Sequence, residues 1–328
     1  MINLNVCPST LAKGYETYSP LAVKHFLGGK RVSHILPYEM IPSENCPMEF
    51  YENRVNMSLS GAQSKYSMLV DNGVFRLTRS GEQGTYILKP ALSDFENPEY
   101  SPANEHLTMQ IAAQVFKLET AQCGLCFTLN GEQAYIVKRY DVKSDGSKIQ
   151  QEDFASLAGL SAATFGGNYK YDALSYEDIG LLIKKFIPAW PVEMVRFFDL
   201  ILFNFLFANG DAHIKNFSIL KTSDGDYRLA PAYDLINTSI HIPWDSIFAL
   251  RKGLYNGWTM HYVTEADFME LASRIGIPQK VARMELERFQ ADYSDVDSLI
   301  DRSFLSEDLK IEYRSIYRTR LNSFLRAS

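Results

Sequence analysis

From residue 54 onward, hydrophobic and polar side chains alternate with a period of two residues, which is typical of half-buried strands. Turn residues Asp71-Asn72-Gly73 interrupt this pattern, and their composition is typical of a tight hairpin. We therefore expect an antiparallel sheet from about residue 54 to residue 90. The first segment, residues 57–65, is read as a strand that continues into a loop of small residues. Further strands are expected at residues 66–70, 74–77 and 85–89.

Two helices flank this predicted sheet in the sequence. A short amphipathic helix is expected to begin at Ser19-Pro20 and to end at Gly28-Gly29. After the sheet, Ser101 is expected to cap a helix with Pro102 at its first position, which places Glu105 in the first turn. Leu107, Ile111 and Val115 recur at intervals of four and predict the buried face of that helix.

The chain then returns to strands before it becomes mainly helical. Strands are expected at residues 123–129 and 133–140, with Asn130-Gly131 as a two-residue hairpin turn. Beyond a polar stretch at 143–148 we expect helices at 152–160, 176–186 and 192–208. A hairpin over 217–229 turns at Asp224-Gly225, and Thr264 to Asp267 is typical of a capping box that starts further helices.

These elements predict an α+β protein with two lobes. We expect an N-terminal appendage at residues 1–49 that packs on the rest, a sheet-based N-lobe at 50–140, and a helical C-lobe at 141–328. A length of 328 residues with 46% hydrophobic side chains suits two cores rather than one.

The net charge and the lengths of the apolar runs argue against two classes of function, direct nucleic-acid binding and a membrane role. A formal net charge of −6 argues against a polyanion-binding surface, so we expect no direct nucleic-acid contact except through a partner. The longest apolar run, residues 197–208, is interrupted by Asp199 and Asn204 and is shorter than the roughly 20 residues of a membrane span. Four cysteines and the absence of a secretory pattern in residues 1–14 lead us to expect a cytoplasmic protein without a membrane role.

The candidate chemistry lies where the apolar helix at 192–208 ends. Asp211 and Asn216 follow it five positions apart, which is the spacing of the protein-kinase catalytic loop. Asp234 follows after the predicted hairpin, and Lys89 ends an apolar strand upstream. Glu105 is available as a partner for Lys89. This order of lysine, Asp-x4-Asn loop, hairpin and second acid predicts a site for magnesium-bound nucleotide.

Simpler interpretations exist for each of these residues. Asn-Gly-Asp is common turn composition, but apolar Phe207 and Phe217 on both sides of the loop favour a buried frame over a solvated loop. Asp234 is followed by an apolar pair, which predicts partial burial. The loop at residues 58–65 contains one glycine and is a weak phosphate-loop candidate by itself. Cys123 and Cys126 form a C-x-x-C pair, but the other two cysteines are isolated, so we expect no zinc site.

Four segments give the chain a resemblance to the HipA family of bacterial serine/threonine kinases, which are toxins of toxin–antitoxin modules. The segments read S-L-S-G-A-Q-S-K at 58–65, Y-I-L-K-P at 86–90, V-K-R-Y-D at 137–141 followed by Q-E-D-F-A, and N-G-D-A-H-I-K-N-F-S followed by L-A-P-A-Y-D-L. The resemblance implies a two-lobed protein-kinase-like fold and an ATP- and Mg2+-dependent enzyme. It implies that Asp211 accepts the substrate proton and that Lys89 neutralises phosphate charge. Asn216 and Asp234 are the implied magnesium ligands.

The resemblance also implies a nucleotide site. Its residues would be Ser60, Gly61, Ala62, Gln63, Ser64, Lys65 and Lys89 around the phosphates, Lys138, Arg139, Tyr140 and Tyr233 around the adenine, and His213, Ile214 and Lys215 with the metal ligands Asn216 and Asp234. In this family a serine of the phosphate loop is autophosphorylated. Ser58 and Ser60 are the candidates here, and an added charge of about −1.5 to −2 would repel the loop from ATP.

Partners and substrate follow from the same resemblance. Only about 50 residues precede Arg54, which is similar to the short form of the family called HipT. We then expect a small HipS-like antitoxin that resembles the missing subdomain, and a HipB-like helix-turn-helix protein that binds DNA. The implied substrate is an aminoacyl-tRNA synthetase, so that the toxin would inhibit translation. A small-molecule kinase and a nucleotide-binding pseudokinase scaffold remain as alternatives.

Overall fold

The structure is a computed structural model that describes residues 4–39, 65–92, 95–242, 246–256, 263–291 and 293–324. The chain divides into two compact units. The first unit comprises Met1–Ile111, Ala121–Ser147 and Asp295–Lys310, and the second comprises Ala112–Thr120, Lys148–Ser294 and Ile311–Ser328. Two helices, α3 (Ser101–Gln114) and α12 (Glu307–Phe324), begin in the first unit and end in the second.

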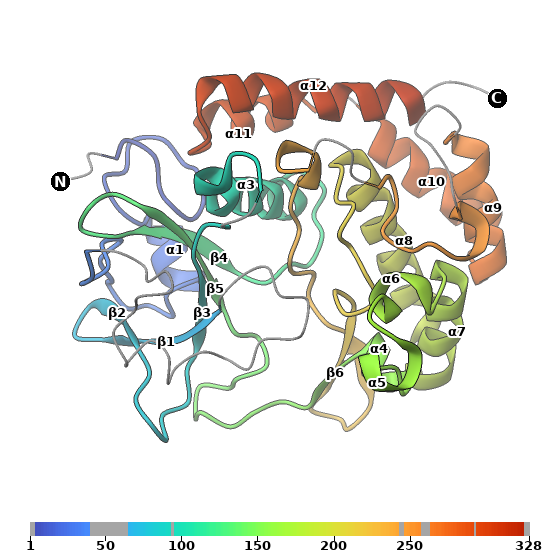
Figure 1. The fold of residues 1–328 in the computed structure, drawn as a ribbon, viewed down its shortest axis with the longest axis horizontal. Coiled ribbons are helices and arrows are strands. Elements are labelled where there is room, and N and C mark those ends of the chain that lie inside the picture. The colour runs from blue at the N-terminus through green and yellow to red at the C-terminus, as the bar shows by residue number, and fades with distance from the viewer. Residues whose placement is uncertain are drawn as a thin grey trace. The chain divides into compact units, whose positions relative to one another are not determined.

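The first unit is built on a five-stranded antiparallel sheet in the order β2-β1-β3-β5-β4 (Figure 1). The strands lie where the sequence pattern predicts them, although the stretch at 57–64 falls outside the described residues. Their bounds are β1 Tyr66–Asp71, β2 Val74–Leu77, β3 Tyr86–Lys89, β4 Cys123–Phe127 and β5 Gln133–Lys138.

One of the two predicted hairpin turns is confirmed and the other is wrong. Asn72 and Gly73 both have positive φ, 48° and 77°, as a two-residue turn between β1 and β2 requires. Between β4 and β5 the connection takes all of residues 128–132 instead of two residues. Thr128 closes this longer loop, because its backbone N–H donates to the Glu132 carbonyl at 2.9 Å and its hydroxyl accepts from the Glu132 N–H at 3.0 Å.

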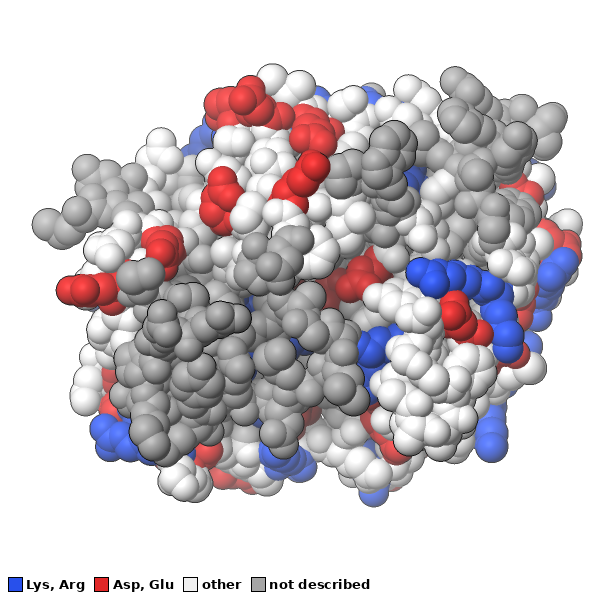
Figure 2. Space-filling model, in the orientation of Figure 1, with Lys and Arg blue, Asp and Glu red and all other residues white. Residues whose placement is uncertain are grey.

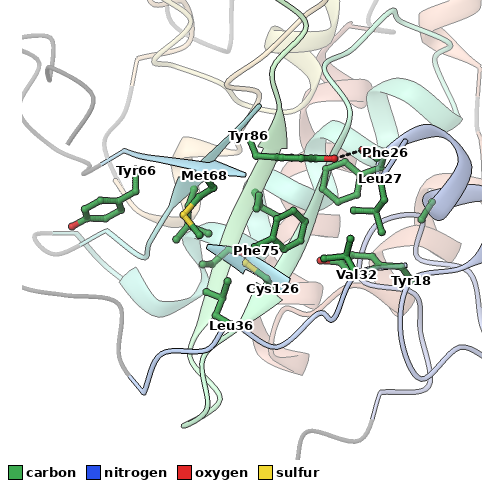
Figure 3. Close-up of a cluster of buried hydrophobic side chains, with 14 of the residues drawn as sticks. Tyr18, Phe26, Leu27, Val32, Leu36, Tyr66, Met68, Phe75, Tyr86 and Cys126 are labelled. Carbon is green, nitrogen blue, oxygen red and sulfur yellow. Dashed lines mark hydrogen bonds between the residues drawn. The ribbon is translucent and has the colours of Figure 1, made fainter. Parts of the chain in front are cut away.

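The N-terminal segment forms part of the core on which the sheet rests. Helix α1 (Pro20–His25) begins at the predicted place, and the Ser19 hydroxyl caps it by accepting from the Ala22 N–H at 3.3 Å. The Tyr86 hydroxyl of β3 donates to the carbonyl of Phe26 at 2.9 Å (Figure 3). The buried cluster that joins this segment to the sheet consists of Cys7, Tyr18, Ala22, Phe26, Leu27, Val32, Leu36, Tyr66, Met68, Phe75, Leu77, Tyr86, Leu88, Cys126, Ala134 and Ile136.

Helix α3 starts differently from the expectation. A short 3-10 turn at Pro98–Tyr100 precedes it, and Ser101 is its first residue rather than its cap. The Ser101 hydroxyl donates to the Pro98 carbonyl at 2.8 Å and accepts from the Leu92 N–H at 2.9 Å, so it is not available to cap α3. Glu105 therefore lies in the second turn of the helix, not in the first.

The second unit is mainly helical. The helices predicted at 176–186 and 192–208 are present as α7 (Tyr176–Phe186) and α8 (Trp190–Leu206), and the capping box of Thr264 with Asp267 starts α9 (Glu265–Ile275) as predicted. The other helices of this unit are α4 Phe154–Leu157, α5 Ala162–Phe165, α6 Tyr169–Asp172 and α10 Gln279–Gln290, with 3-10 turns at Thr238–Ile240 and Gly253–Tyr255. Helix α11 (Ser294–Arg302) belongs to the first unit except for its first residue.

A small sheet accompanies these helices, with β6 (Gln151–Asp153), β7 (Ser218–Lys221) and β8 (Tyr227–Leu229) in that order. The hairpin predicted at 217–229 is confirmed as β7 and β8. The helix expected over 152–160 is wrong at its start, because residues 151–153 pair with β7 and the helix begins only at residue 154. In the part of the chain that the structure describes, no helix is both long and apolar enough to span a membrane.

Candidate active site

One group of candidate residues is an ion pair inside the first unit. Lys89 is the last residue of β3, and its Nζ lies 2.6 Å from Oε1 of Glu105 on α3. Both side chains are only 5% exposed. Lys89 Nζ also lies 5.4 Å from the ring centroid of Tyr135, its neighbour on β5. The pairing that the sequence offered is therefore present, with both charges shielded from water.

A second group of candidate residues, inside the second unit, begins where α8 ends. The predicted frame is confirmed, because Phe207 and Phe217 are 0% and 3% exposed. The Phe207 ring stacks on Tyr317 with centroids 4.9 Å apart, and the Phe217 ring meets Phe197 edge-on at 5.3 Å. The polar loop between these two phenylalanines is thus fixed at both ends by aromatic packing.

Asn209 and Thr238 tie this loop to the segment that carries Asp234. The Asn209 amide donates to the Asp234 carbonyl oxygen at 3.3 Å. The Thr238 hydroxyl accepts from the Gly210 N–H at 2.8 Å and donates to the Ala208 carbonyl at 2.9 Å. Sequence reasoning gave neither residue a role. Asn209 stands within the loop motif, but the tertiary approach of Thr238 has no signal in the local pattern.

Asp234 is half-buried, as expected, and its backbone is unusual. Its φ is 57°, in the left-handed region that residues other than glycine seldom adopt. Ala208, which directly precedes Asn209, has a φ of 51° and so lies in the same region. Strained backbone of this kind clusters at functional sites, where the surrounding contacts hold it in place.

The oxygen donors of Asn216 and Asp234 suit magnesium. Both side chains are half-buried. Within the described residues no group of three or more His, Cys, Asp or Glu side chains could hold a metal ion. Magnesium is usually bound through one or two carboxylates together with substrate phosphates, and does not need a full protein cage. The residues present therefore fit a phosphate-bound magnesium ion.

The residues between Asp211 and Asn216 are tightly packed. His213 is 8% exposed, burial lowers its pKa, and its Nδ1 has no hydrogen-bond partner within the described residues. Ile214 is fully buried, and its N–H donates to the Lys170 carbonyl at 3.2 Å. Lys215 pairs with Asp153 at 3.0 Å. The ammonium of Lys215 is thus held beside the start of α4.

Tyr233 anchors the end of the loop. Its hydroxyl donates to the Lys215 carbonyl at 2.8 Å and lies 2.5 Å from the Ser218 hydroxyl. Burial raises the pKa of Tyr233, so the phenol stays protonated and can donate. The predicted place of Tyr233 beside the adenine stays a prediction.

The other predicted nucleotide residues within the described part of the chain lie in a strand of the first unit's sheet or directly before or after one. The Lys138 ammonium, whose pKa is lowered by burial, donates to the His25 carbonyl at 3.0 Å. Arg139 makes a two-point contact with Asp141 at 2.9 and 2.5 Å, and Tyr140 between them is half-buried. Lys65 directly precedes β1. The remaining loop residues, Ser58, Ser60, Gly61, Ala62, Gln63 and Ser64, lie outside the described residues.

The C-x-x-C pair lies inside the sheet of the first unit. Cys123 and Cys126 are free and buried in β4. Burial raises the pKa of Cys123 to about 12, and the Gln110 amide donates to its sulfur at 3.4 Å. Thiolate is the form that binds metals and attacks disulfides, so this environment disfavours both roles.

Asp211, at the centre of the loop, is exposed and accepts a hydrogen bond on Oδ1 from the Tyr171 hydroxyl at 2.5 Å. Tyr171 belongs to α6, forty positions earlier, and its ring meets His213 edge-on with centroids 5.3 Å apart. The sequence pattern gave no indication of Tyr171, because nothing local connects a tyrosine at 171 to an aspartate at 211.

Comparison with known sequences points to one family. A family profile described as "HipA-like C-terminal domain" matches residues 57–296. The protein named "Putative kinase Y4mE" of Sinorhizobium fredii is 31% identical over 214 residues, 63% of this chain and 48% of that protein. The "Serine/threonine-protein kinase toxin HipA" of Shewanella oneidensis is 23% identical over 220 residues, 62% of this chain and 48% of that protein. The chain thus spans about half the length of both relatives.

Solved structures agree on the fold. HipA from Shewanella oneidensis MR-1, solved with HipB and operator DNA, has a TM-score of 0.66 at 20% identity, covering 87% of this chain and 68% of that one. The Helicobacter pylori proinflammatory kinase CtkA has a TM-score of 0.51 at 17% identity, covering 80% of this chain and 90% of that one. These likenesses confirm the two-lobed, kinase-like α+β fold predicted from the sequence.

Proposed function

This chain belongs to the HipA-like C-terminal domain family, and from that membership we propose that it is an ATP- and magnesium-dependent protein serine/threonine kinase. The observation that carries the proposal is the buried contact of Lys89 with Glu105. In protein kinases a strand lysine paired with a helix glutamate holds the ATP phosphates. A buried ion pair contributes little net stability, which favours a functional reason for retaining it.

The loop supplies the groups that phosphoryl transfer needs. Asp211 would accept the proton of a serine or threonine hydroxyl as its oxygen bonds to the γ-phosphorus and the bond to ADP breaks. Asn216 and Asp234 would hold magnesium, which neutralises phosphate charge when bound. Lys89 would bind the phosphates. His213, Ile214, Lys215 and Tyr233 would shape the site.

A kinase toxin acting on an aminoacyl-tRNA synthetase is the proposed biological role. HipA of Shewanella oneidensis supports the toxin part, since its sequence is named a kinase toxin and its structure was solved with HipB and operator DNA. We accordingly propose a HipB-like helix-turn-helix partner. The synthetase substrate and the HipS-like small antitoxin stay predictions of the family resemblance.

The decisive experiment incubates the purified chain with γ-labelled ATP and a cell lysate. A labelled protein band is the expected result, whereas a labelled small molecule would favour the alternative of a small-molecule kinase. No label at all would favour a nucleotide-binding scaffold. Asp211→Asn is the control: its turnover should fall by orders of magnitude while ATP binding is retained. Loss of ATP binding in a folded Asp211→Asn protein would contradict the proposed role of Asp211.

The same labelled sample tests the proposed regulation. Phosphopeptide mapping should find phosphate on Ser58, on Ser60 or on both in the active protein and on neither in Asp211→Asn. Phosphate next to the nucleotide phosphates would repel them and lower activity. Active protein in which neither serine carries phosphate would overturn autophosphorylation as the switch.

A further inference from the structure

We infer that Tyr171 positions Asp211 for phosphoryl transfer, by binding one carboxylate oxygen and presenting the other to the substrate hydroxyl. This inference rests on the proposed kinase function. Its starting point is the 2.5 Å contact from the Tyr171 hydroxyl to Oδ1 of Asp211. Within the described residues no donor is found for Oδ2 of Asp211.

An exposed aspartate needs such a contact in order to have a defined orientation. The terminal torsion of an aspartate side chain is soft, and water can replace any single partner at the surface. Asp211 is exposed, and its loop is fixed by packing at Phe207 and Phe217 rather than at the carboxylate itself. The Tyr171 hydroxyl is therefore the group that selects one carboxylate orientation among those the loop permits.

Tyr171 can serve as a fixed donor because its own ring is held. The Arg251 guanidinium lies 5.2 Å from the centroid of the Tyr171 ring, and the His213 ring meets Tyr171 edge-on at 5.3 Å. The Arg251 N–H donates to the Tyr171 carbonyl at 2.9 Å. The adjacent Lys170 carbonyl accepts from the Ile214 N–H at 3.2 Å. Both backbone and ring of this segment are thus bound to their surroundings.

The same contact could instead block Asp211, with the phenol standing where a substrate hydroxyl belongs. The held ring argues against that role, because a blocking group must leave before each turnover. Release would break the contacts with Arg251 and His213 together with the bond to Asp211. A donor that stays on Oδ1 leaves Oδ2 available throughout, which suits positioning.

The test compares Tyr171→Phe with Tyr169→Phe in the full chain. Tyr169 lies on the same helix, is buried, and no hydrogen bond of its hydroxyl is found in the described part of the chain. The probe is γ-labelled ATP with the lysate protein that the wild type labels. Tyr171→Phe should lower kcat roughly 10- to 100-fold, since small misplacements of a reacting group cost rates of that order. The KM for ATP, the number of nucleotides bound per chain and the Tm should be unchanged.

Several results would overturn the inference. Equal kcat for both variants would show that the hydroxyl is dispensable, and a higher kcat for Tyr171→Phe would make Tyr171 a blocking group. A parallel loss of kcat, bound nucleotide and Tm would show a structural role. Should Tyr171→Phe not fold, Arg251→Gln gives a second reading: loosening the ring should lower kcat severalfold at unchanged KM for ATP, and unchanged kcat would overturn the inference. A wild type that transfers no phosphate overturns the proposed function and this inference with it.

Discussion

At the scale of single residues, variants of the buried pair Lys89 and Glu105 can distinguish its effect on the unfolding free energy from its effect on ATP binding. Glu105→Gln leaves the Lys89 ammonium at 5% exposure without its carboxylate partner. Breaking a buried ion pair in this way costs about 3–5 kcal/mol of unfolding free energy. We expect urea denaturation to measure a loss of that size, together with weaker ATP binding.

The matched control replaces both charges. Lys89→Met combined with Glu105→Leu removes the unpaired charge and retains apolar volume, so the unfolding free energy should return close to that of the wild type. ATP binding should nevertheless stay weak, because no ammonium remains for the phosphates. A stable double variant that binds ATP like the wild type would contradict the proposed role of Lys89.

The order of residues along the sequence predicted candidates for the site; of these predictions the contact of Lys89 with Glu105 is confirmed, and the roles of Asp211, Asn216 and Asp234 stay predictions. Lys89, Asp211, Asn216 and Asp234 follow one another in the order of a kinase, and the structure gives Lys89 the partner that was anticipated. Tyr171 could not be predicted, because its contact with Asp211 depends on how α6 approaches the loop. Contacts across forty residues have no periodicity from which to recognise them.

At the scale of elements, α3 carries a second buried titratable group. His106 is 1% exposed, its Nε2 lies 2.8 Å from the Ser9 carbonyl, and burial lowers its pKa to about 4. A histidine whose folded pKa lies below its unfolded value of about 6.5 binds its proton more readily in the unfolded chain. This group therefore leaves stability intact above pH 6.5 and lowers it as the pH falls from 6.5 toward 4.

The size of this effect is about 3 kcal/mol by pH 4. We expect His106→Gln to show a correspondingly smaller loss of unfolding free energy between pH 7 and pH 4.5 than the wild type. Denaturant titrations at several pH values measure it. His25→Gln is the control, since His25 is exposed on α1 and should leave the wild-type pH dependence in place. If the unfolding free energies of wild type and His106→Gln changed in parallel with pH, the assignment of this pH dependence to His106 would be contradicted.

Elements were predictable where local pattern and tertiary pairing agree. Helices α7 and α8 and the β7–β8 hairpin lie as expected, because each carries its own periodicity and end signals. Residues 152 and 153 were expected to be helical and belong to a strand, since their pairing with β7 overrides local preference. The same limit applies to the loop at 128–132, which is closed by two hydrogen bonds between Thr128 and Glu132.

At the scale of the whole molecule, the chain passes repeatedly from one unit to the other, whereas the predicted lobes meet at a single boundary in the sequence. The stretch Asp295–Lys310 belongs to the first unit although it follows the helices of the second. Within the first unit, Phe304 packs against Phe127 with centroids 5.7 Å apart and accepts from the Gln133 amide at 3.3 Å. Such returns of the chain are set by long-range packing and leave no mark in hydrophobic periodicity.

Charge is the whole-molecule property that bears on partners. The net charge is −6, and Figure 2 shows acidic side chains gathered over α11 and the start of α12 on the face in view. Asp295, Asp301, Glu307 and Asp308 are exposed on these two helices. Duplex DNA is bound mainly by clusters of lysine and arginine that replace its counterions. DNA contact through a basic partner therefore suits this chain better than direct contact.

We accordingly expect the purified chain alone not to retard a labelled duplex at about 150 mM salt, where the Debye length is about 8 Å and long-range attraction is screened. Addition of a HipB-like partner should produce retardation, and the chain should then shift the partner–DNA band further. Omitting the partner at each protein concentration is the control. Retardation by the chain alone, weakening steeply with added salt, would reveal a basic surface that the net charge conceals and would contradict binding through a partner.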